Sequence, residues 1–205
     1  MYLADIYRNF RLLRFVYSYL YYFKWLIFGK PVDVVPHVVK RRTISYLQKK
    51  FRLNTLIETG TYLGDMVYAQ RKNFREIHSI ELSEQLFQKF KRKFAKYKHI
   101  RIYQGDSASQ IKEVLKKVQS PALFWLDAHY SAGITAKSNQ NSVALIEIAS
   151  IFQTGLRHVI LLDDARCFNG YDGYPSLNEI NFMIKNHNIS YTMKIENDIV
   201  ILLPD

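Results

Sequence analysis

The chain has 205 residues, of which 48% are hydrophobic and 15% aromatic, and it contains one cysteine. This composition predicts one globular domain with a sizeable core in a reducing compartment, and it excludes a wholly disordered chain and an internal disulfide framework. The net charge is +11, but residues 1–52 hold eleven Lys and Arg against two acidic residues, whereas residues 101–205 hold nine against eleven. The basic surface is therefore expected to lie apart from the acidic second half, which disfavours a nucleic-acid partner.

Residues 2–28 have a composition typical of a helix, and a Gly-Lys-Pro sequence ends it. The apolar and tyrosine-rich stretch Phe15–Phe28 is shorter than the roughly 20 residues that cross a hydrocarbon core. It also lacks the cleavage site of a signal peptide. Because Arg8, Arg11 and Arg14 recur at a spacing of three, the segment is typical of a helix that lies on an anionic membrane surface. The alternative is a helix that packs on the domain or on a second subunit.

Residues 1–52 are thus expected to form a helical segment that contacts a membrane surface or a homo-oligomer partner through residues 1–30. A second helix is expected over about Val38–Phe51, with Lys40-Arg41-Arg42 in solvent. The expected location is the cytoplasm, with peripheral attachment to the inner face of the membrane as a possibility that this segment raises.

From residue 53 onward, strand-like and helix-like segments alternate, which predicts an α/β domain over residues 53–205. Strands are expected at 53–58, 77–82, 100–105, 122–128, 158–164, 189–196 and 198–205, and helices at about 63–73, 84–97, 108–119, 141–153 and 176–187. The five β-α repeats predict a Rossmann-like, mostly parallel sheet with helices on both faces. The last two strands are so close in sequence that they can only form an antiparallel hairpin.

The first strand runs into a loop with the sequence ETGTYLGD, which spans Glu58–Asp65. Its two glycines, four residues apart, allow a tight turn and the close approach of a ligand. The loop is neither a P-loop nor a GxGxxG motif, which disfavours a dinucleotide. Its acidic residues suit a cofactor with positive charge. Glu81 ends the second strand, where a carboxylate can grip ribose hydroxyls, and Asp106 with Ser107 follows the third strand, where they can face adenine.

Two apolar strands end in acidic residues, the first in Asp127 and the second in Asp163 and Asp164. The carboxyl ends of parallel strands meet at one edge of a sheet, so these side chains are expected to share a site. Three clustered carboxylates would repel one another, and Mg²⁺ or another divalent cation would resolve this. His129 is then placed to act as the general base. The alternative is that all four residues cap turns or bond the backbone.

These motifs resemble those of the class I S-adenosylmethionine-dependent methyltransferases, and the acidic set is similar to that of metal-dependent sugar O-methyltransferases of the macrocin type. The resemblance covers about residues 53–205 and implies a seven-stranded sheet. One departure is Tyr62, where many members have glycine. The resemblance implies that Asp127, Asp163 and Asp164 hold the metal. It also implies a cofactor-binding set that comprises Glu58, Thr59, Gly60, Tyr62, Gly64, Glu81, Asp106, Ser107 and Asp127.

The expected function is methyl transfer from S-adenosylmethionine to a hydroxyl of a sugar or glycan, with Asp127 and His129 as catalytic residues. Tyr130, Arg166 and Tyr171 lie in segments that could line the acceptor pocket. One alternative is a methyltransferase for another acceptor, either a nucleic acid or a small metabolite. A different class of alternative is a membrane-associated binding protein that keeps the fold without catalysis.

Overall fold

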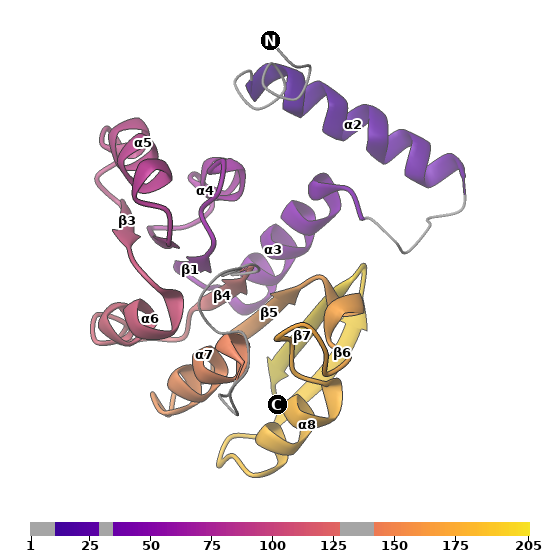
Figure 1. Cartoon of the computed structure of the whole chain (residues 1–205), viewed down its shortest axis with the longest axis vertical. Helices are drawn as coiled ribbons and strands as arrows, with labels where there is room; N and C mark the ends of the chain where they lie inside the picture. The colour runs from indigo at the N-terminus through magenta and orange to yellow at the C-terminus, as the bar shows by residue number, and fades with distance from the viewer. Residues whose placement is uncertain (1–10, 29–34, 128–141) are drawn as a thin grey trace.

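The computed structural model describes residues 11–28, 35–127 and 142–205. Its centre is one seven-stranded sheet with the strand order β3-β2-β1-β4-β5-β7-β6 (Figure 1). The strands are β1 (Thr55–Thr59), β2 (Glu76–Glu81), β3 (Ile100–Gln104), β4 (Leu123–Leu126), β5 (Val159–Asp163), β6 (Tyr191–Glu196) and β7 (Ile199–Pro204).

Strands β1 to β5 pair in parallel, whereas β7 is antiparallel to both of its neighbours, β5 and β6. The β6–β7 turn has its two central residues, Asn197 and Asp198, at φ values of 53° and 58°. Asparagine and aspartate tolerate this left-handed conformation, which matches the twist of a tight hairpin. The predicted mostly parallel sheet with a closing antiparallel hairpin is confirmed.

Helices cover both faces of the sheet, as the alternating sequence predicts. Ile44 of α3 and Phe90 of α5 belong to a buried cluster on one face, and Ile148 of α7 and Ile180 of α8 belong to a cluster on the other. In the described part of the chain, the helices and the 3₁₀ turn are α2 (Arg11–Ile27), α3 (His37–Phe51), α4 (Asp65–Gln70), α5 (Glu84–Phe94), α6 (Ser107–Leu115), α7 (Val143–Phe152), η1 (Ala165–Cys167) and α8 (Leu177–Lys185).

Helix α2 is the outermost element and lies across the top of the molecule in Figure 1, next to α3. Arg14 and Trp25 are buried on its inner side. Its other side carries large apolar residues in solvent, and residues at spacings of three and four share a face of a helix. We call the following set the outward stripe: Leu12, Val16, Leu20, Phe23 and Ile27. Leu12, at one edge of this stripe, also borders a cavity on the inner side of the helix.

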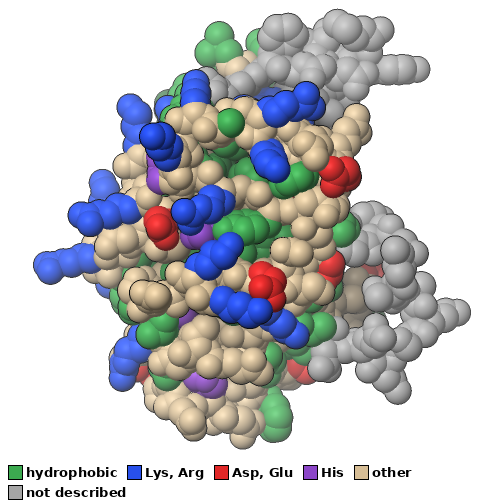
Figure 2. All heavy atoms as spheres, turned by 90° about the vertical axis from the view of Figure 1, so that its left-hand side faces the viewer, with side chains coloured by type: hydrophobic (Ala, Val, Ile, Leu, Met, Phe, Trp, Pro, Cys, Tyr) green, Lys and Arg blue, Asp and Glu red, His purple; other side chains and the backbone are tan. Residues whose placement is uncertain are grey.

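The predicted N-terminal helix from residue 2 is described from Arg11 onward, and residues 2–10 lie outside the described part of the chain. Within the described residues, no helix has the length and hydropathy that a membrane span requires. A separate feature of the surface is a basic face around α5 and the edge strand β3, where Figure 2 shows many Lys and Arg side chains. The last turn of α5 contributes Lys91, Arg92 and Lys93.

Candidate active site

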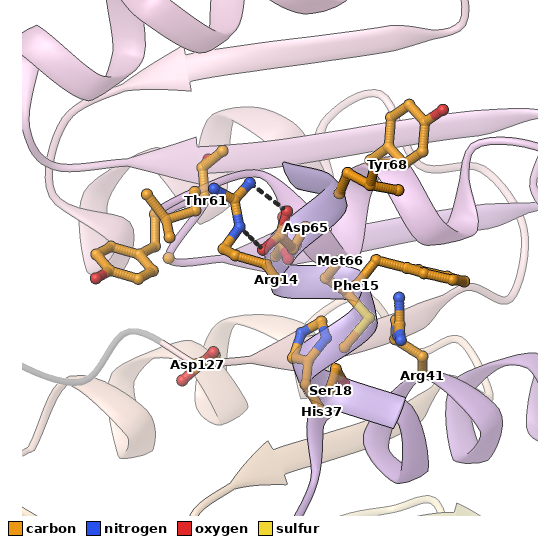
Figure 3. Close-up of a pocket in the computed structure, with 15 residues that line it drawn as sticks. Arg14, Phe15, Ser18, His37, Arg41, Thr61, Asp65, Met66, Tyr68 and Asp127 are labelled. Atoms are coloured by element: carbon orange, nitrogen blue, oxygen red, sulfur yellow. Dashed lines mark hydrogen bonds and ion pairs between the residues drawn. The ribbon is translucent and has the colours of Figure 1, made fainter. Parts of the chain in front are cut away.

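A cavity of about 750 Å³ opens at the carboxyl end of β1, beside the switch in strand order between β1 and β4. Ligands of doubly wound sheets bind at such a switch point. One wall is the glycine loop that follows β1, and the other is formed by the N-terminal helices (Figure 3). From α2 and α3 the lining residues are Leu12, Arg14, Phe15, Ser18, His37 and Arg41.

The glycine loop is held in a compact turn by its own backbone and by β2. Gly60 has a φ of 87°, and its N–H donates to the carbonyl of Ile80 over 2.9 Å. Gly64 has a φ of 64° and precedes α4. A Cβ atom there would lie 2.9 Å from ring carbons of both Phe90 and Phe94, so this glycine lets α5 pack closely against the loop. Tyr62, which stands where the resemblance of the motif leads one to expect glycine, also has a positive φ, of 44°.

Glu81 ties the end of β2 to the glycine loop. Its Oε2 accepts a hydrogen bond from the N–H of Tyr62 over 2.7 Å, and its Oε1 accepts one from the N–H of Ser83 over 2.9 Å. A carboxylate oxygen can accept more than one hydrogen bond, but Glu81 is buried and is not among the residues that line the cavity. The ribose-binding role of Glu81 stays a prediction, and the structure adds a role in shaping the loop.

Glu58 lines the cavity from the end of β1 and is 2% exposed. Its Oε2 accepts a hydrogen bond from Ser79 over 2.6 Å. Burial raises the pKa of Glu58 to about 8, because the apolar surroundings disfavour the charged form. The carboxyl group is therefore mostly protonated at neutral pH and can donate a hydrogen bond to a ligand.

Thr59 and Ser107 point away from this cavity, toward α7. Both are buried, and their hydroxyl groups lie against Glu147, which is 1% exposed. Burial raises the pKa of Glu147 to about 7, and the two hydroxyl groups act in the opposite direction. Asp106 caps α6, since its carboxylate accepts from the N–H of Ser109 over 3.0 Å. The adenine-facing roles predicted for Asp106 and Ser107 are not tested by these contacts.

The acidic strand ends come together as the sequence predicts. Leu126 pairs with Leu162 in adjacent strands, which brings Asp127 and Asp163 to the same edge. Burial, and then the neighbouring carboxylate of Asp163, raise the pKa of Asp127 well above its usual value. The cluster is therefore one electrostatic unit at the edge of the cavity.

Lys40 of α3 forms ion pairs with the carboxylates of Asp163 and Asp164. Its Nζ lies 2.5 Å from Oδ1 of Asp163 and 3.1 Å from Oδ1 of Asp164. Burial disfavours the ammonium ion, but the two carboxylates outweigh it and raise the pKa of Lys40. The expectation that Lys40 lies in solvent is wrong, because the side chain is only 11% exposed. Arg166 also contacts Asp164, over 2.9 Å, and pairs with Asp198.

This arrangement does not fit a divalent cation. Two of the three predicted ligands already bind an ammonium ion, and Lys40 supplies the positive charge that a metal would bring. Among residues 11–28, 35–127 and 142–205, no group of three or more acidic, His or Cys side chains is arranged to hold a metal. The predicted general base, His129, and Tyr130 lie outside the described residues.

Several lining residues were not identified from the sequence. Arg14 of α2 binds Asp65 in a bidentate ion pair, with Nε 2.8 Å from Oδ2 and Nη2 2.9 Å from Oδ1. His37 and Arg41 are four residues apart on α3 and share a face, which is the one signal that could have paired them. Burial, and then the charge of Arg41, lower the pKa of His37 to about 4, so its ring is neutral.

No family model matches the sequence, and no curated protein sequence matches it. Solved structures do resemble the fold. A methyltransferase from Podospora anserina, bound to SAH, is 15% identical with a TM-score of 0.57, and the match covers 92% of this chain and 88% of that one. The O-methyltransferase TomG from Streptomyces achromogenes, involved in tomaymycin synthesis and bound to SAM, is 12% identical with a TM-score of 0.58, covering 88% and 85%.

A third structure, from Staphylococcus aureus, is assigned provisionally as a caffeoyl-CoA O-methyltransferase. It is 16% identical with a TM-score of 0.55, and the match covers 100% of this chain and 98% of that one. The strand order, the closing hairpin and these similarities agree with the family resemblance of the sequence motifs. The chain therefore has the fold of the class I S-adenosylmethionine-dependent methyltransferases.

Proposed function

We propose that this chain is an S-adenosylmethionine-dependent O-methyltransferase that acts on a hydroxyl of a sugar or glycan. The observation that carries the proposal is the shared cavity, in which the glycine loop and the acidic strand end at Asp127 line the same space. The sugar as acceptor rests on the sequence resemblance to macrocin-type enzymes alone, because Lys40 replaces the metal at Asp163 and Asp164. The solved O-methyltransferases with the same fold support the reaction class.

The cofactor supplies an electrophilic methyl group on a sulfonium. The acceptor oxygen attacks the methyl carbon, the carbon–sulfur bond breaks toward sulfur, and S-adenosylhomocysteine leaves. His129 takes the proton of the acceptor hydroxyl in this proposal, since a neutral imidazole is a suitable base near pH 7. Glu58, protonated at neutral pH, keeps negative charge away from its side of the cavity and can donate to the cofactor.

Calorimetric titration with S-adenosylhomocysteine tests the cofactor assignment. We expect Glu81→Ala to weaken binding by more than tenfold, which is about 1.4 kcal/mol. Binding to the wild type with no loss in the variant would remove the assigned role of Glu81. No binding to the wild type would reject the methyltransferase proposal.

Transfer of labelled methyl groups to a panel of glycans and small glycosides tests the reaction. We expect His129→Ala to lower turnover by about 10²–10⁴-fold while cofactor affinity is kept. Full turnover in that variant would reject His129 as the base. Labelling of RNA or of a small metabolite in place of every glycan would move the assignment to another acceptor.

The proposed reaction has no metal step, because Lys40 binds two of the three predicted metal ligands, Asp163 and Asp164. Turnover is therefore expected to persist in excess chelator. Loss of turnover that Mg²⁺ restores would overturn this expectation and return the Asp127, Asp163 and Asp164 set to the role of metal ligands.

We further propose that α2 attaches the protein to an anionic membrane surface, with cytoplasmic residence and peripheral attachment. The outward stripe is apolar along the whole helix, and its end residues, Leu12 and Ile27, are 73% and 76% exposed. Exposed apolar side chains on this scale mark an interaction surface. Helices α2 and α3 contain no acidic residue, and Lys24, Arg42 and Lys49 are among their exposed basic side chains.

Charge favours a membrane over a second copy of the chain. In a symmetric pair that meets through the outward stripe, two layers without any acidic residue would face each other and repel. An anionic lipid surface attracts the same layer, because basic residues near such a surface gain about 1 kcal/mol each. The stripe would then enter the interface between headgroups and acyl chains.

Flotation with vesicles that contain phosphatidylserine tests this attachment. Leu20→Glu with Phe23→Glu is expected to abolish flotation, since it places charge in the middle of the stripe without removing the cavity wall. The matched control is Phe182→Glu on α8, where the side chain is 70% exposed but lies outside α2. Equal flotation of both variants would reject the proposal, and a stable wild-type dimer that the α2 variant converts to a monomer would replace the membrane by a second subunit.

A further inference from the structure

The wall of the cavity that α2 and α3 provide carries hydrogen-bond donors that nothing in the described part of the chain satisfies. Nη2 of Arg41 and Oγ of Ser18 are both buried and, among the described residues, neither has a hydrogen-bond partner. Both residues line the cavity. Two further buried atoms lack a partner among the described residues, Oγ1 of Thr59 and Oε1 of Glu147, but they lie outside this cavity. Buried polar groups in folded proteins nearly always have a partner, so the pair that borders one cavity points to a ligand.

The two donors lie together. Figure 3 shows Ser18, His37 and Arg41 on the same side of the cavity, away from the Arg14–Asp65 ion pair. The Arg41 guanidinium lies over the ring of Phe15, with Cζ 6.0 Å from the ring centroid, so its planar fork is held against an apolar surface. His37 precedes Arg41 by one helical turn and also lines the cavity.

The acidic residues of the same cavity balance the charge of Arg41 only in part: burial lowers the pKa of Arg41, and the opposing effect of Asp65 does not outweigh it. Asp65 is engaged by both nitrogens of Arg14 that face it. Asp127 and Glu58 are buried carboxyl groups whose pKa values are raised, and Glu58 is mostly protonated at neutral pH. The cavity therefore offers a guanidinium ion, a hydroxyl and a neutral imidazole to a bound group.

We propose that Arg41, with Ser18 and His37, forms a subsite for an oxyanion, that is, a carboxylate or phosphate group carried by a bound substrate. A guanidinium presents several N–H donors in one plane, which matches the two oxygens of such a group. The inference rests on the proposed function and refines its substrate class. The oxyanion belongs either to an acidic acceptor, such as a uronate or a sugar phosphate, or to the amino-acid portion of the cofactor.

The test compares Arg41→Gln with Arg42→Gln as a matched control. Arg42 is the next residue, is exposed, and donates to Tyr22 over 2.8 Å, outside the cavity. Because Arg41 Nη2 has no protein partner among the described residues, the first variant is expected to fold, which thermal unfolding checks. The probes are S-adenosylhomocysteine, methylthioadenosine, which lacks the carboxylate, and glucuronate or inorganic phosphate added to protein saturated with S-adenosylhomocysteine.

If the cofactor supplies the oxyanion, Arg41→Gln weakens S-adenosylhomocysteine by at least tenfold and leaves methylthioadenosine unchanged. If the acceptor supplies it, the variant keeps cofactor affinity and loses at least tenfold in affinity for glucuronate or phosphate. Ser18→Ala is expected to shift the same probe in the same direction, by less. If the wild type binds S-adenosylhomocysteine and Arg41→Gln changes the affinity for none of the probes, the subsite is overturned. If the wild type does not bind S-adenosylhomocysteine, the proposed function is overturned instead.

Discussion

At the scale of single residues, the acidic edge of the cavity owes its charge balance to Lys40. Its ammonium ion lies 2.5 Å from the carboxylate of Asp163 and 3.1 Å from that of Asp164, and it compensates negative charges that would otherwise be buried without a partner. Removing one member of a buried ion pair leaves an uncompensated charge, which is more costly than the pair itself is stabilising. These contacts indicate that Asp163 and Asp164 need Lys40 in order to stay charged in their buried positions.

Lys40→Met is expected to lower the free energy of unfolding at pH 7 by about 3–5 kcal/mol, because it leaves Asp163 and Asp164 without the ammonium ion. Chemical denaturation measures this. The control is Lys116→Met, which removes an exposed ion pair with Glu113 of 2.7 Å and should cost less than about 1 kcal/mol. Equal losses in the two variants would show that the buried pair has no special weight.

Glu58 predicts a dependence of stability on pH. Its pKa in the folded chain is about 8, above its ordinary value of 4.5, so the folded state holds this proton more tightly than the unfolded state. The contribution of Glu58 is fully present below about pH 4.5 and is lost as the pH rises through 8, at about 1.4 kcal/mol for each pH unit. Glu58→Gln should remove this slope between pH 5 and 8, as measured by urea denaturation at several pH values. A slope that is unchanged in the variant would contradict the assignment.

At the scale of elements, the packing of the glycine loop against α5 is set by Gly64. We expect Gly64→Ala to cost about 1 kcal/mol for a side chain at a φ of 64° and a further 1–3 kcal/mol for its contacts at 2.9 Å with Phe90 and Phe94. Gly155→Ala separates the two effects, since its φ is 68° but no atom lies within 4 Å. Thermal unfolding of both variants gives the difference, and equal shifts would show that the loop yields to the added methyl group.

The same elements show how much the sequence reveals. Strand ends, the hairpin and the meeting of Asp127 with Asp163 follow from alternation and parallel pairing, which are local patterns. The contacts of Lys40, Arg14 and Arg41 do not follow, because each depends on how a helix near the N-terminus is rotated against distant strands. Within β1, side chains alternate between the two faces of the sheet. Glu58 lines the cavity, so its neighbour Thr59 faces α7, although the predicted cofactor-binding set contains both residues.

At the scale of the whole molecule, two of the basic regions of the surface differ in what accompanies the charge. One is the pair of N-terminal helices, and the other is the face around α5 and β3 (Figure 2). Only the first also carries large exposed apolar residues along a helix, the outward stripe. A surface with both properties binds lipid by burying apolar side chains and by attracting anionic headgroups, whereas a surface with charge alone binds more weakly.

Vesicle binding should therefore respond to salt only in part. Raising the ionic strength from about 0.1 M to 1 M shortens the screening length from roughly 10 Å to 3 Å and removes the electrostatic attraction. We expect flotation to weaken but to persist, because burial of the outward stripe is not screened. Complete release in high salt would assign the binding to charge alone, and Lys91→Glu with Lys93→Glu would then test the second basic region.

The Lys40 ion pair also has a consequence in time. It joins residues 124 positions apart in the chain, so it cannot form until the polypeptide has been made through the end of β5. The first strands and their helices can associate earlier, while the side chain of Lys40 is still exposed to solvent. Closing so long a loop costs chain entropy before the contact can stabilise the fold, so we expect this contact to form late in folding. Weakening a contact that forms so late speeds unfolding more than it slows folding.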